Sequence, residues 1–356
     1  MPEGLANLNP SIMAELRRNA LKFSSVMLPL IGIAAGAMRL NGATVFTLNI
    51  LALIPLGPWI SRSVDALSVG GLRAVNELLK STLGNSVELM IGINAIAQKR
   101  PHISQSVILG SVLSNLLLVL GSTLFISGYD KKRLRFDRTL TTVLSSLMTV
   151  VFILLAIPTI MDVFPSAKNT PTSQILFTQR ITAVILIALL MTFLLFRLGT
   201  HAAMFASTPF SQNDANTRQS RHQHRQSQII EAQLPRPYLG KNVAGLVLAA
   251  ASGCTFGCTY YIVNSLAEVA GMTGSNESFL AVTIVPILGN FVKYHSIVTG
   301  SRSYSQIELG IRAIINSVLR VTMLIVPLLV LVGYAIIAFS FYVRPGVPAN
   351  VIFLSS

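Results

Sequence analysis

Residues 84–88 read Gly-Asn-Ser-Val-Glu, and residues 289–293 read Gly-Asn-Phe-Val-Lys. Both copies adjoin long apolar stretches, LGNSVELMIGINAIA at 83–97 and FLAVTIVPILGNFVKYHSIV at 279–298. An apolar stretch of about 20 residues is long enough to cross a lipid bilayer as a helix. The repeated motif therefore predicts two related membrane-embedded halves, one placing Glu88 and the other Lys293 within an apolar segment.

The composition of the whole chain supports a membrane location. Of 356 residues, 52% are hydrophobic and 11% are charged, and the mean hydropathy is +0.65. Soluble domains carry about 25% charged residues, so lipid must solvate most of this chain. We predict an all-α polytopic membrane protein with about nine transmembrane helices, the last of them bent or double. The apolar runs are 24–38, 43–60, 83–97, 104–126, 140–160, 181–196, 243–266, 279–298 and 306–339.

The net charge of +14 follows the expected topology. When the runs alternate in direction, most of the Lys and Arg residues before Lys241 fall on one side of the membrane. The positive-inside rule assigns that side to the cytoplasm, together with the N-terminus and the basic segment 130–138. Residues 1–22 lack the pattern of a cleaved signal peptide and are interpreted as a cytoplasmic tail. The basic charge is thus explained without a nucleic-acid partner.

A second matched motif shows that the halves are repeats. Ser111-Val-Leu-Ser114 corresponds to Ser317-Val-Leu-Arg320, and it begins 26 residues after Asn85 in one half and 27 after Asn290 in the other. The repeats are assigned to residues 23–206 and 241–356, joined by a basic polar linker at 207–240. Inverted repeats of spanning helices are typical of secondary transporters, whose substrate site lies between the repeats near the middle of the bilayer.

The polar residues of the first repeat suit a cation that exchanges with protons. Asn85 and Glu88 are three residues apart and share a helix face, and Ser111, Ser114 and Asn115 share a face on the next helix. Carboxylate, amide and hydroxyl oxygens are the ligands of hard cations such as Ca²⁺, and a buried carboxylate also takes up a proton readily. The alternative is that these groups only join helices by hydrogen bonds. No nucleophile–base pair lies on a span, so neither an enzyme nor a cofactor is expected.

Three stretches resemble one transporter family. GNSVELMIGINAIA at 84–97, GSVLSNLLLVLG at 110–121 and SGYDKKRLRFD at 127–137 closely resemble cation/proton exchangers of the vacuolar Ca²⁺/H⁺ antiporter type, within the Na⁺/Ca²⁺ exchanger superfamily. The resemblance implies two inverted repeats, Ca²⁺ and H⁺ as substrates, contact with membrane lipid, and a vacuolar membrane. It also implies a cation and proton site whose metal ligands are Glu88 and Asn85. The further site residues are Ser111, Ser114, Asn115, Asn290 and Ser317.

The second repeat departs from the family pattern. The positions of the family's glutamate and following histidine hold Lys293 and Tyr294, and Arg320 stands at another site position. We expect Lys293 and Arg320 to oppose a divalent cation, and Lys293 to form an ion pair with Glu88 across the pseudo-twofold axis. The second repeat is also shortened, because the two closing helices that the resemblance implies do not appear before Ser356.

Three functions remain open from the sequence. The first is proton-coupled calcium antiport into the vacuole, with Glu88 as the shared cation and proton site. The second is a transport-incompetent homologue that is kept as a scaffold or regulator, because Lys293 and Arg320 replace site residues. The third is a carrier of an anionic or monovalent substrate. Calcium uptake driven by an acidic vesicle lumen separates the first function from the other two.

Overall fold

A computed structural model describes residues 26–68, 73–129, 138–163, 172–200, 240–300 and 307–343. Within these ranges the chain is helical apart from short turns, and it contains no strand. The prediction of an all-α membrane fold is therefore confirmed. The N-terminal tail at 1–22 and all of the linker except Gly240 lie outside the described residues, so the predicted domain boundaries stay predictions.

The two repeats have the same order of elements. Each begins with a long helix, continues with a helix that is broken at the Gly-Asn motif, and then has a long span interrupted by a π-helical segment. In the first repeat, after a short helix at Val26–Ala37, these elements are α2 (Gly42–Ser68), α3 (Arg73–Leu83), α4 (Ser86–Ala97), α5 (Pro101–Leu113), η1 (Ser114–Val119) and α6 (Leu120–Gly128). In the second they are α11 (Lys241–Thr273), α12 (Glu277–Gly289), α13 (Phe291–Gly300), α14 (Ile307–Arg320), η4 (Val321–Ile325) and α15 (Val326–Val343).

The first repeat is completed by α7 (Arg138–Val163), α8 (Thr172–Leu195) and η3 (Phe196–Thr200). In the described residues, six helices are long and apolar enough to span a membrane, and the bent pair α12–α13 would make a seventh. Two further apolar helices, Val26–Ala37 and Ser86–Ala97, are shorter. The predicted count of nine spans is not confirmed. The last apolar run is a single span from Gly310 to Ile336 that passes through η4.

Local sequence explains several helix boundaries. Pro101 occupies the first turn of α5, where its missing N–H costs no hydrogen bond. Gly274 ends α11 with a φ of +65°, a left-handed conformation that glycine adopts without steric cost. Asn276 then caps α12, because its side-chain oxygen accepts a hydrogen bond from the Ser278 N–H at 3.2 Å. These signals place α11 and α12 as consecutive helices joined by a tight turn.

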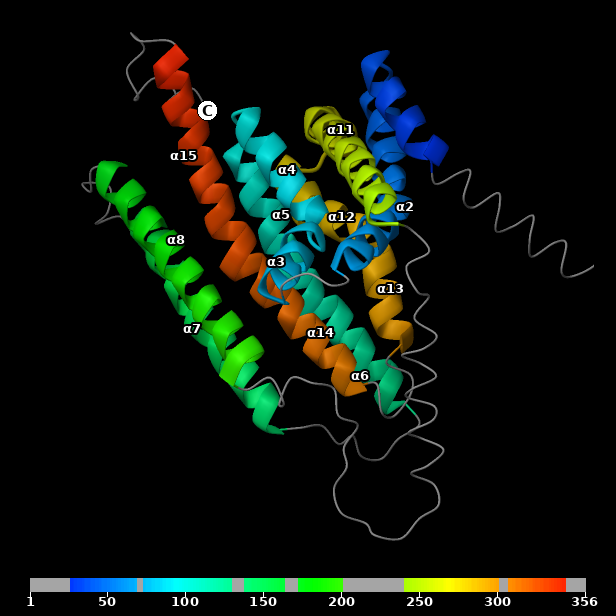
Figure 1. Ribbon diagram of the computed structural model, residues 1–356. Coiled ribbons are helices and arrows are strands. Elements are labelled where there is room, and N and C mark those ends of the chain that lie inside the picture. Colours follow the sequence, from blue (N-terminus) through cyan, green and yellow to red (C-terminus); the bar gives the residue numbers. More distant parts are fainter. Residues whose placement is uncertain are drawn as a thin grey trace, which may run out of the picture.

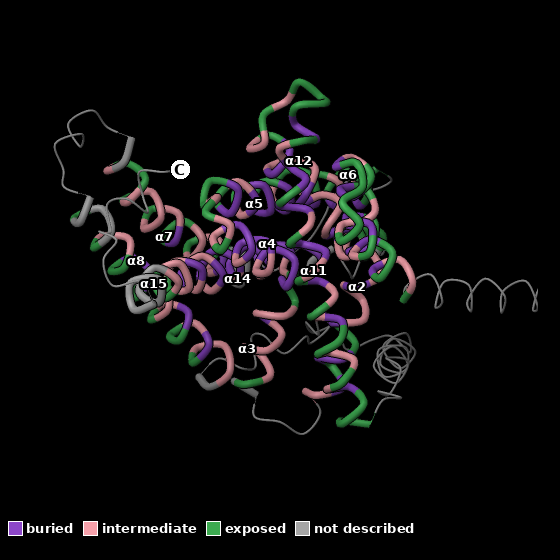
Figure 2. Tube along the Cα trace, turned by 90° about the horizontal axis from the view of Figure 1, so that it is seen from above, coloured by how far each residue is buried: buried purple, intermediate pink, exposed green. Residues whose placement is uncertain are grey.

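The core lies where the repeats meet. Helices α2 and α11 pack along each other, and their buried apolar side chains join those of α4, α5 and α12 in one cluster. Helices α5 and α12 approach closely at Gly110, where a Cβ would collide with the Val282 carbonyl oxygen. Figure 2 shows α4 near the centre of the bundle with α7 and α8 towards its edge. The motif on α4 is thus held at the centre.

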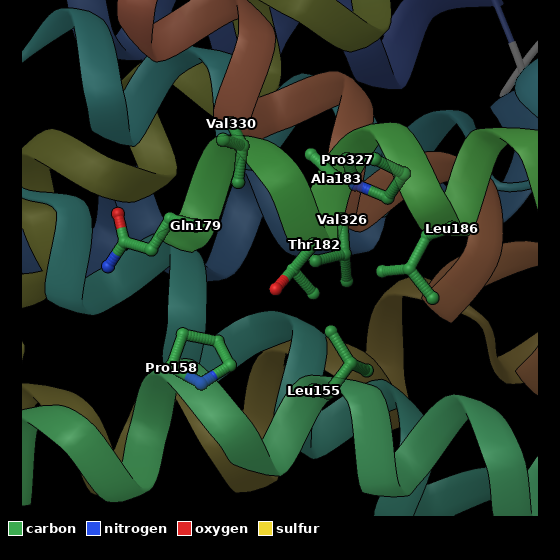
Figure 3. A pocket seen from close by; sticks show the side chains of 9 residues that line it. All are labelled: Leu155, Pro158, Gln179, Thr182, Ala183, Leu186, Val326, Pro327 and Val330. Carbon is green, nitrogen blue, oxygen red and sulfur yellow. The ribbon is translucent and has the colours of Figure 1, made fainter. Parts of the chain in front are cut away.

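Helices α7 and α8 form a peripheral pair beside α15 (Figure 1). Between these three helices lies a small apolar cavity of about 60 Å³ (Figure 3). It is lined by Leu155, Pro158, Gln179, Thr182, Ala183, Leu186, Val326, Pro327 and Val330. None of the predicted site residues lines this cavity, so its walls take no part in the polar site described below.

Candidate cation and proton site

The two motif asparagines sit at the breaks of the two broken helices. Asn85 separates α3 from α4, and Asn290 separates α12 from α13, where the bend is 58°. The side-chain amide of each asparagine donates to the carbonyl oxygen four residues earlier, that of Ser81 at 3.1 Å and that of Pro286 at 3.4 Å. Broken helices leave backbone groups without intrahelical partners. The Ser81 and Pro286 carbonyls each accept such a side-chain hydrogen bond, and that of Pro286 also accepts the Asn290 backbone N–H at 3.2 Å.

Glu88 lies in the first turn of α4 and is only 1% exposed. Its Oε1 accepts hydrogen bonds from Ser111 Oγ at 2.7 Å and from Asn290 Nδ2 at 2.9 Å. Its Oε2 is buried and has no hydrogen-bond partner among the residues that the structure describes. The carboxylate is therefore held at one oxygen by both repeats, while the other oxygen is left with unused acceptor capacity.

Lys293 occupies the matching position of the second repeat and makes the matching contacts. Its Nζ donates to Asn85 Oδ1 at 2.9 Å and to Ser317 Oγ at 2.8 Å. Each ionisable residue is thus bound by the serine of its own repeat and by the asparagine of the other. The arrangement gives structural support to the sequence alignment of Asn85 with Asn290 and of Ser111 with Ser317.

The structure differs from the expected ion pair between Glu88 and Lys293. Among the described residues, no contact of 4.0 Å or less joins the carboxylate and the ammonium. The reason is geometric, because each side chain already has hydrogen bonds with an asparagine of the opposite motif. The two charges lie in one polar cluster, each with its own set of hydrogen bonds.

The remaining predicted residues surround this cluster. Asn115 is fully buried, donates to the Ser111 carbonyl at 2.7 Å and to the Tyr294 hydroxyl at 3.4 Å, and has a buried Oδ1 without a partner. Ser114, 7% exposed, begins η1 and has no hydrogen bond to Glu88 in the described part of the chain. Tyr294 is 5% exposed and completes the site from α13. Segments η1 and η4 follow the two matched serine motifs, and π-helical turns frequently mark functional sites.

Comparison with known proteins relates the first repeat to one family. Residues 41–199 match the family model of the sodium/calcium exchanger protein. The match spans most of the first repeat, and there the chain is similar to this exchanger family. The chain is 29% identical over 308 residues to the vacuolar calcium ion transporter of Schizosaccharomyces pombe. This alignment covers 86% of this chain and 69% of the relative. It is 28% identical over 338 residues to vacuolar cation/proton exchanger 1a of Oryza sativa subsp. japonica, covering 93% of this chain and 70% of the relative.

Solved structures show the same fold for the exchanger. Native YfkE aligns with a TM-score of 0.66 at 22% identity, covering 88% of this chain and 82% of that one. The H⁺/Ca²⁺ exchanger CAX aligns with a TM-score of 0.57 at 14% identity, covering 91% of this chain and 75% of that one. Both similarities extend well beyond the first repeat. The second half of the exchanger therefore retains the fold despite its changed motif residues.

Arg320 of the exchanger has a partner that the sequence did not reveal. Its Nη2 lies 3.8 Å from Glu77 Oε2, and the same oxygen lies 3.1 Å from Arg197 Nη1. The three partly buried side chains join α3, η3 and α14. The expectation that Arg320 opposes a divalent cation stays a prediction, and Glu77 offsets part of the charge of Arg320. The polar character of residues 73–83 was the available signal for Glu77, but the apolar run was taken to begin at Leu83.

The oxygen atoms of this site suit a hard cation bound by one carboxylate and several neutral groups. The described residues contain no group of three or more His, Cys, Asp or Glu side chains that could hold a metal ion. A cation at this site would depend on the single carboxylate of Glu88 together with amide and hydroxyl oxygens. Such oxygen ligands suit Ca²⁺, whereas soft metals prefer sulfur and imidazole ligands.

Proposed function

We propose that the exchanger is a proton-coupled calcium antiporter in which Ca²⁺ and H⁺ share Glu88. The observation that carries this proposal is the burial and the hydrogen bonding of the Glu88 carboxylate. It is buried between the two repeats, bound at Oε1 by Ser111 and Asn290, and without a partner at Oε2. An ionisable group within a membrane span is costly and marks an ion or proton pathway.

The chemistry of exchange follows from competition at one carboxylate. A buried carboxylate is more stable in its neutral, protonated form unless a cation compensates its charge. Ca²⁺ binding therefore requires that the proton leaves, and protonation from an acidic compartment weakens Ca²⁺ binding. Glu88 Oε2 and Asn115 Oδ1 are buried oxygens without partners, and both residues have hydrogen bonds with Ser111. We assign these two oxygens to the cation together with Asn85 Oδ1, which accepts a hydrogen bond from Lys293 Nζ at 2.9 Å in this structure.

The relatives support the choice of substrate and membrane. Those from fission yeast and rice are named as vacuolar transporters of calcium ions and as vacuolar cation/proton exchangers. We extend both features to this chain, and place its N-terminus on the cytoplasmic side as the positive-inside rule requires. Calcium would then leave the cytoplasm as protons leave the acidic lumen.

The test is calcium uptake into sealed vesicles with an acidic lumen that contain the protein. The wild-type chain is expected to take up Ca²⁺ and to stop when a protonophore removes the pH gradient. Glu88→Gln keeps the shape of the side chain but removes its charge, so uptake should fall to that of empty vesicles. Asp65→Asn is the matched control, because the Asp65 side chain is 64% exposed and forms an ion pair with Lys80 at the surface. Uptake by Glu88→Gln equal to that of the wild type would refute the proposal.

The position of Lys293 favours a second candidate function, a homologue that does not transport. Its ammonium already occupies Asn85 Oδ1 and Ser317 Oγ. In that case the wild-type chain would take up no Ca²⁺ in the same assay. Recovery of uptake by Lys293→Glu combined with Arg320→Gln would then support a scaffold or regulatory role for the natural sequence. Proton-driven uptake by the wild type would exclude it.

A further inference from the structure

We infer that the Lys293 ammonium is a tethered competitor of the transported cation and sets the affinity of the exchanger for it. This inference rests on the proposed function, since it concerns the same site. The ammonium is held 2.9 Å from Asn85 Oδ1 and 2.8 Å from Ser317 Oγ. A cation that uses these oxygens must first displace it.

The competition follows from the chemistry of the two oxygens. A lysine ammonium is a compact positive charge with three N–H donors and no acceptor, so it binds the same lone pairs that a metal cation coordinates. Hydrogen bonds to a charged group are stronger than those between neutral groups. The contacts of Lys293 therefore hold the second-repeat side of the site closed to Ca²⁺ until the ammonium moves away.

The two repeats hold opposite charges at equivalent positions, so only the second repeat supplies a competing cation. In the first repeat, Ser111 and Asn290 hold the anionic Glu88. In the second repeat, the corresponding Ser317 and Asn85 hold the cationic Lys293. The empty cluster thus contains one negative and one positive charge. A bound cation is attracted by the first and repelled by the second, and both energies grow in proportion to its charge.

Lys293 is also placed so that it can withdraw. It lies near the start of α13, directly after the helix break at Asn290, and its side chain is partly exposed, whereas Glu88 is only 1% exposed. Its flexible four-carbon stem allows the ammonium to move away from Asn85 and Ser317 while the backbone stays in place. Release of Asn85 and Ser317 then opens the site without unfolding α13.

The test compares equilibrium Ca²⁺ binding by purified wild-type protein and its variants in lipid nanodiscs at one fixed pH. Lys293→Gln removes the charge and weakens both hydrogen bonds of this side chain. Each hydrogen bond to a charged group is typically worth about tenfold or more in binding, so Ca²⁺ should bind about 100-fold more tightly. Lys293→Glu should bind more tightly still, and it provides a second variant if Lys293→Gln does not fold. Lys293→Arg keeps the charge and should remain weak. Lys241→Gln, at an exposed lysine that begins α11, should match the wild type.

The outcomes separate this inference from the proposed function. Tighter binding by Lys293→Gln that disappears in Glu88→Gln/Lys293→Gln supports both. Equal Ca²⁺ affinity of the wild type, Lys293→Gln and Lys293→Glu overturns the competitor and leaves antiport at Glu88 intact. Binding by Lys293→Gln that persists without the Glu88 carboxylate supports the competitor but overturns the assigned calcium ligand. Failure of every folded variant to bind Ca²⁺ overturns both.

Discussion

At the scale of single residues, the site depends on four neutral side chains that hold two opposite charges. Asn290 and Ser111 bind Glu88, while Asn85 and Ser317 bind Lys293. A buried charge without hydrogen bonds is strongly destabilising. The neutral residues therefore contribute to the stability of the protein as well as to its chemistry, and this contribution can be measured without a transport assay.

Ser317→Ala tests that contribution directly. It removes one of the two oxygens that accept hydrogen bonds from the Lys293 ammonium, so the protein should lose about 1–3 kcal/mol of stability. The expected result is a lower thermal unfolding temperature of the detergent-solubilised protein. Ser296→Ala is the matched control, since Ser296 is exposed and its hydroxyl donates to the Lys293 backbone carbonyl and not to the ammonium. An equal effect of the two substitutions would mean that the Ser317–Lys293 contact contributes nothing.

At the scale of helices, the sequence predicted the elements better than their ends. The apolar runs at 43–60, 104–126 and 243–266 all lie within long helices, because hydropathy reports how a segment is solvated. The π-helical segments η1 and η4 leave no such signal, since they change the hydrogen-bonding of the backbone and not the composition. The exact break at each Gly-Asn motif was also hidden, because two half-helices have the same composition as one span.

The site was predicted in part for the same reason. Motif matching brought Glu88, Ser111 and Asn290 together correctly, because equivalent positions of inverted repeats meet near the pseudo-twofold axis. It did not reveal that Asn85, and not Glu88, accepts the hydrogen bond of Lys293. The choice between these partners depends on side-chain geometry within a few ångströms. The contact of Arg320 with Glu77 was missed because it joins helices that no repeat pattern relates.

The close approach of α5 and α12 should be sensitive to one methyl group. A Cβ at Gly110 would collide with the backbone carbonyl of Val282, which cannot move without shifting α12. Gly110→Ala should therefore cost about 1–3 kcal/mol by overpacking, seen as a lower thermal unfolding temperature and reduced Ca²⁺ uptake. Gly121→Ala in α6 is the control, because a Cβ there meets no atom within 4 Å. Unchanged stability of Gly110→Ala would show that the two helices separate easily.

At the scale of the whole molecule, the two repeats run in opposite directions and share one polar cluster at their contact. The alternation of the predicted spans places the turns at Arg39 and Lys99, both with positive φ, on one side of the membrane and Lys241, where α11 begins, on the other. The positive-inside rule assigns the Lys241 end to the cytoplasm. Under the proposed antiport, this orientation would decide which side supplies calcium and which supplies protons to Glu88.

Cysteine labelling tests this orientation with two exposed lysines at opposite ends. Lys99→Cys and Lys241→Cys are introduced after Cys254 and Cys258 have been replaced by serine, and intact vacuoles are treated with a membrane-impermeant maleimide. Because the cytoplasmic face of a vacuole is outermost, Lys241→Cys should be labelled at once and Lys99→Cys only after the membrane is permeabilised. The reverse pattern would place the N-terminus in the lumen. In that case the end of the bundle assigned to the cytoplasm would face the acidic lumen. The direction of calcium movement would then have to be reassigned.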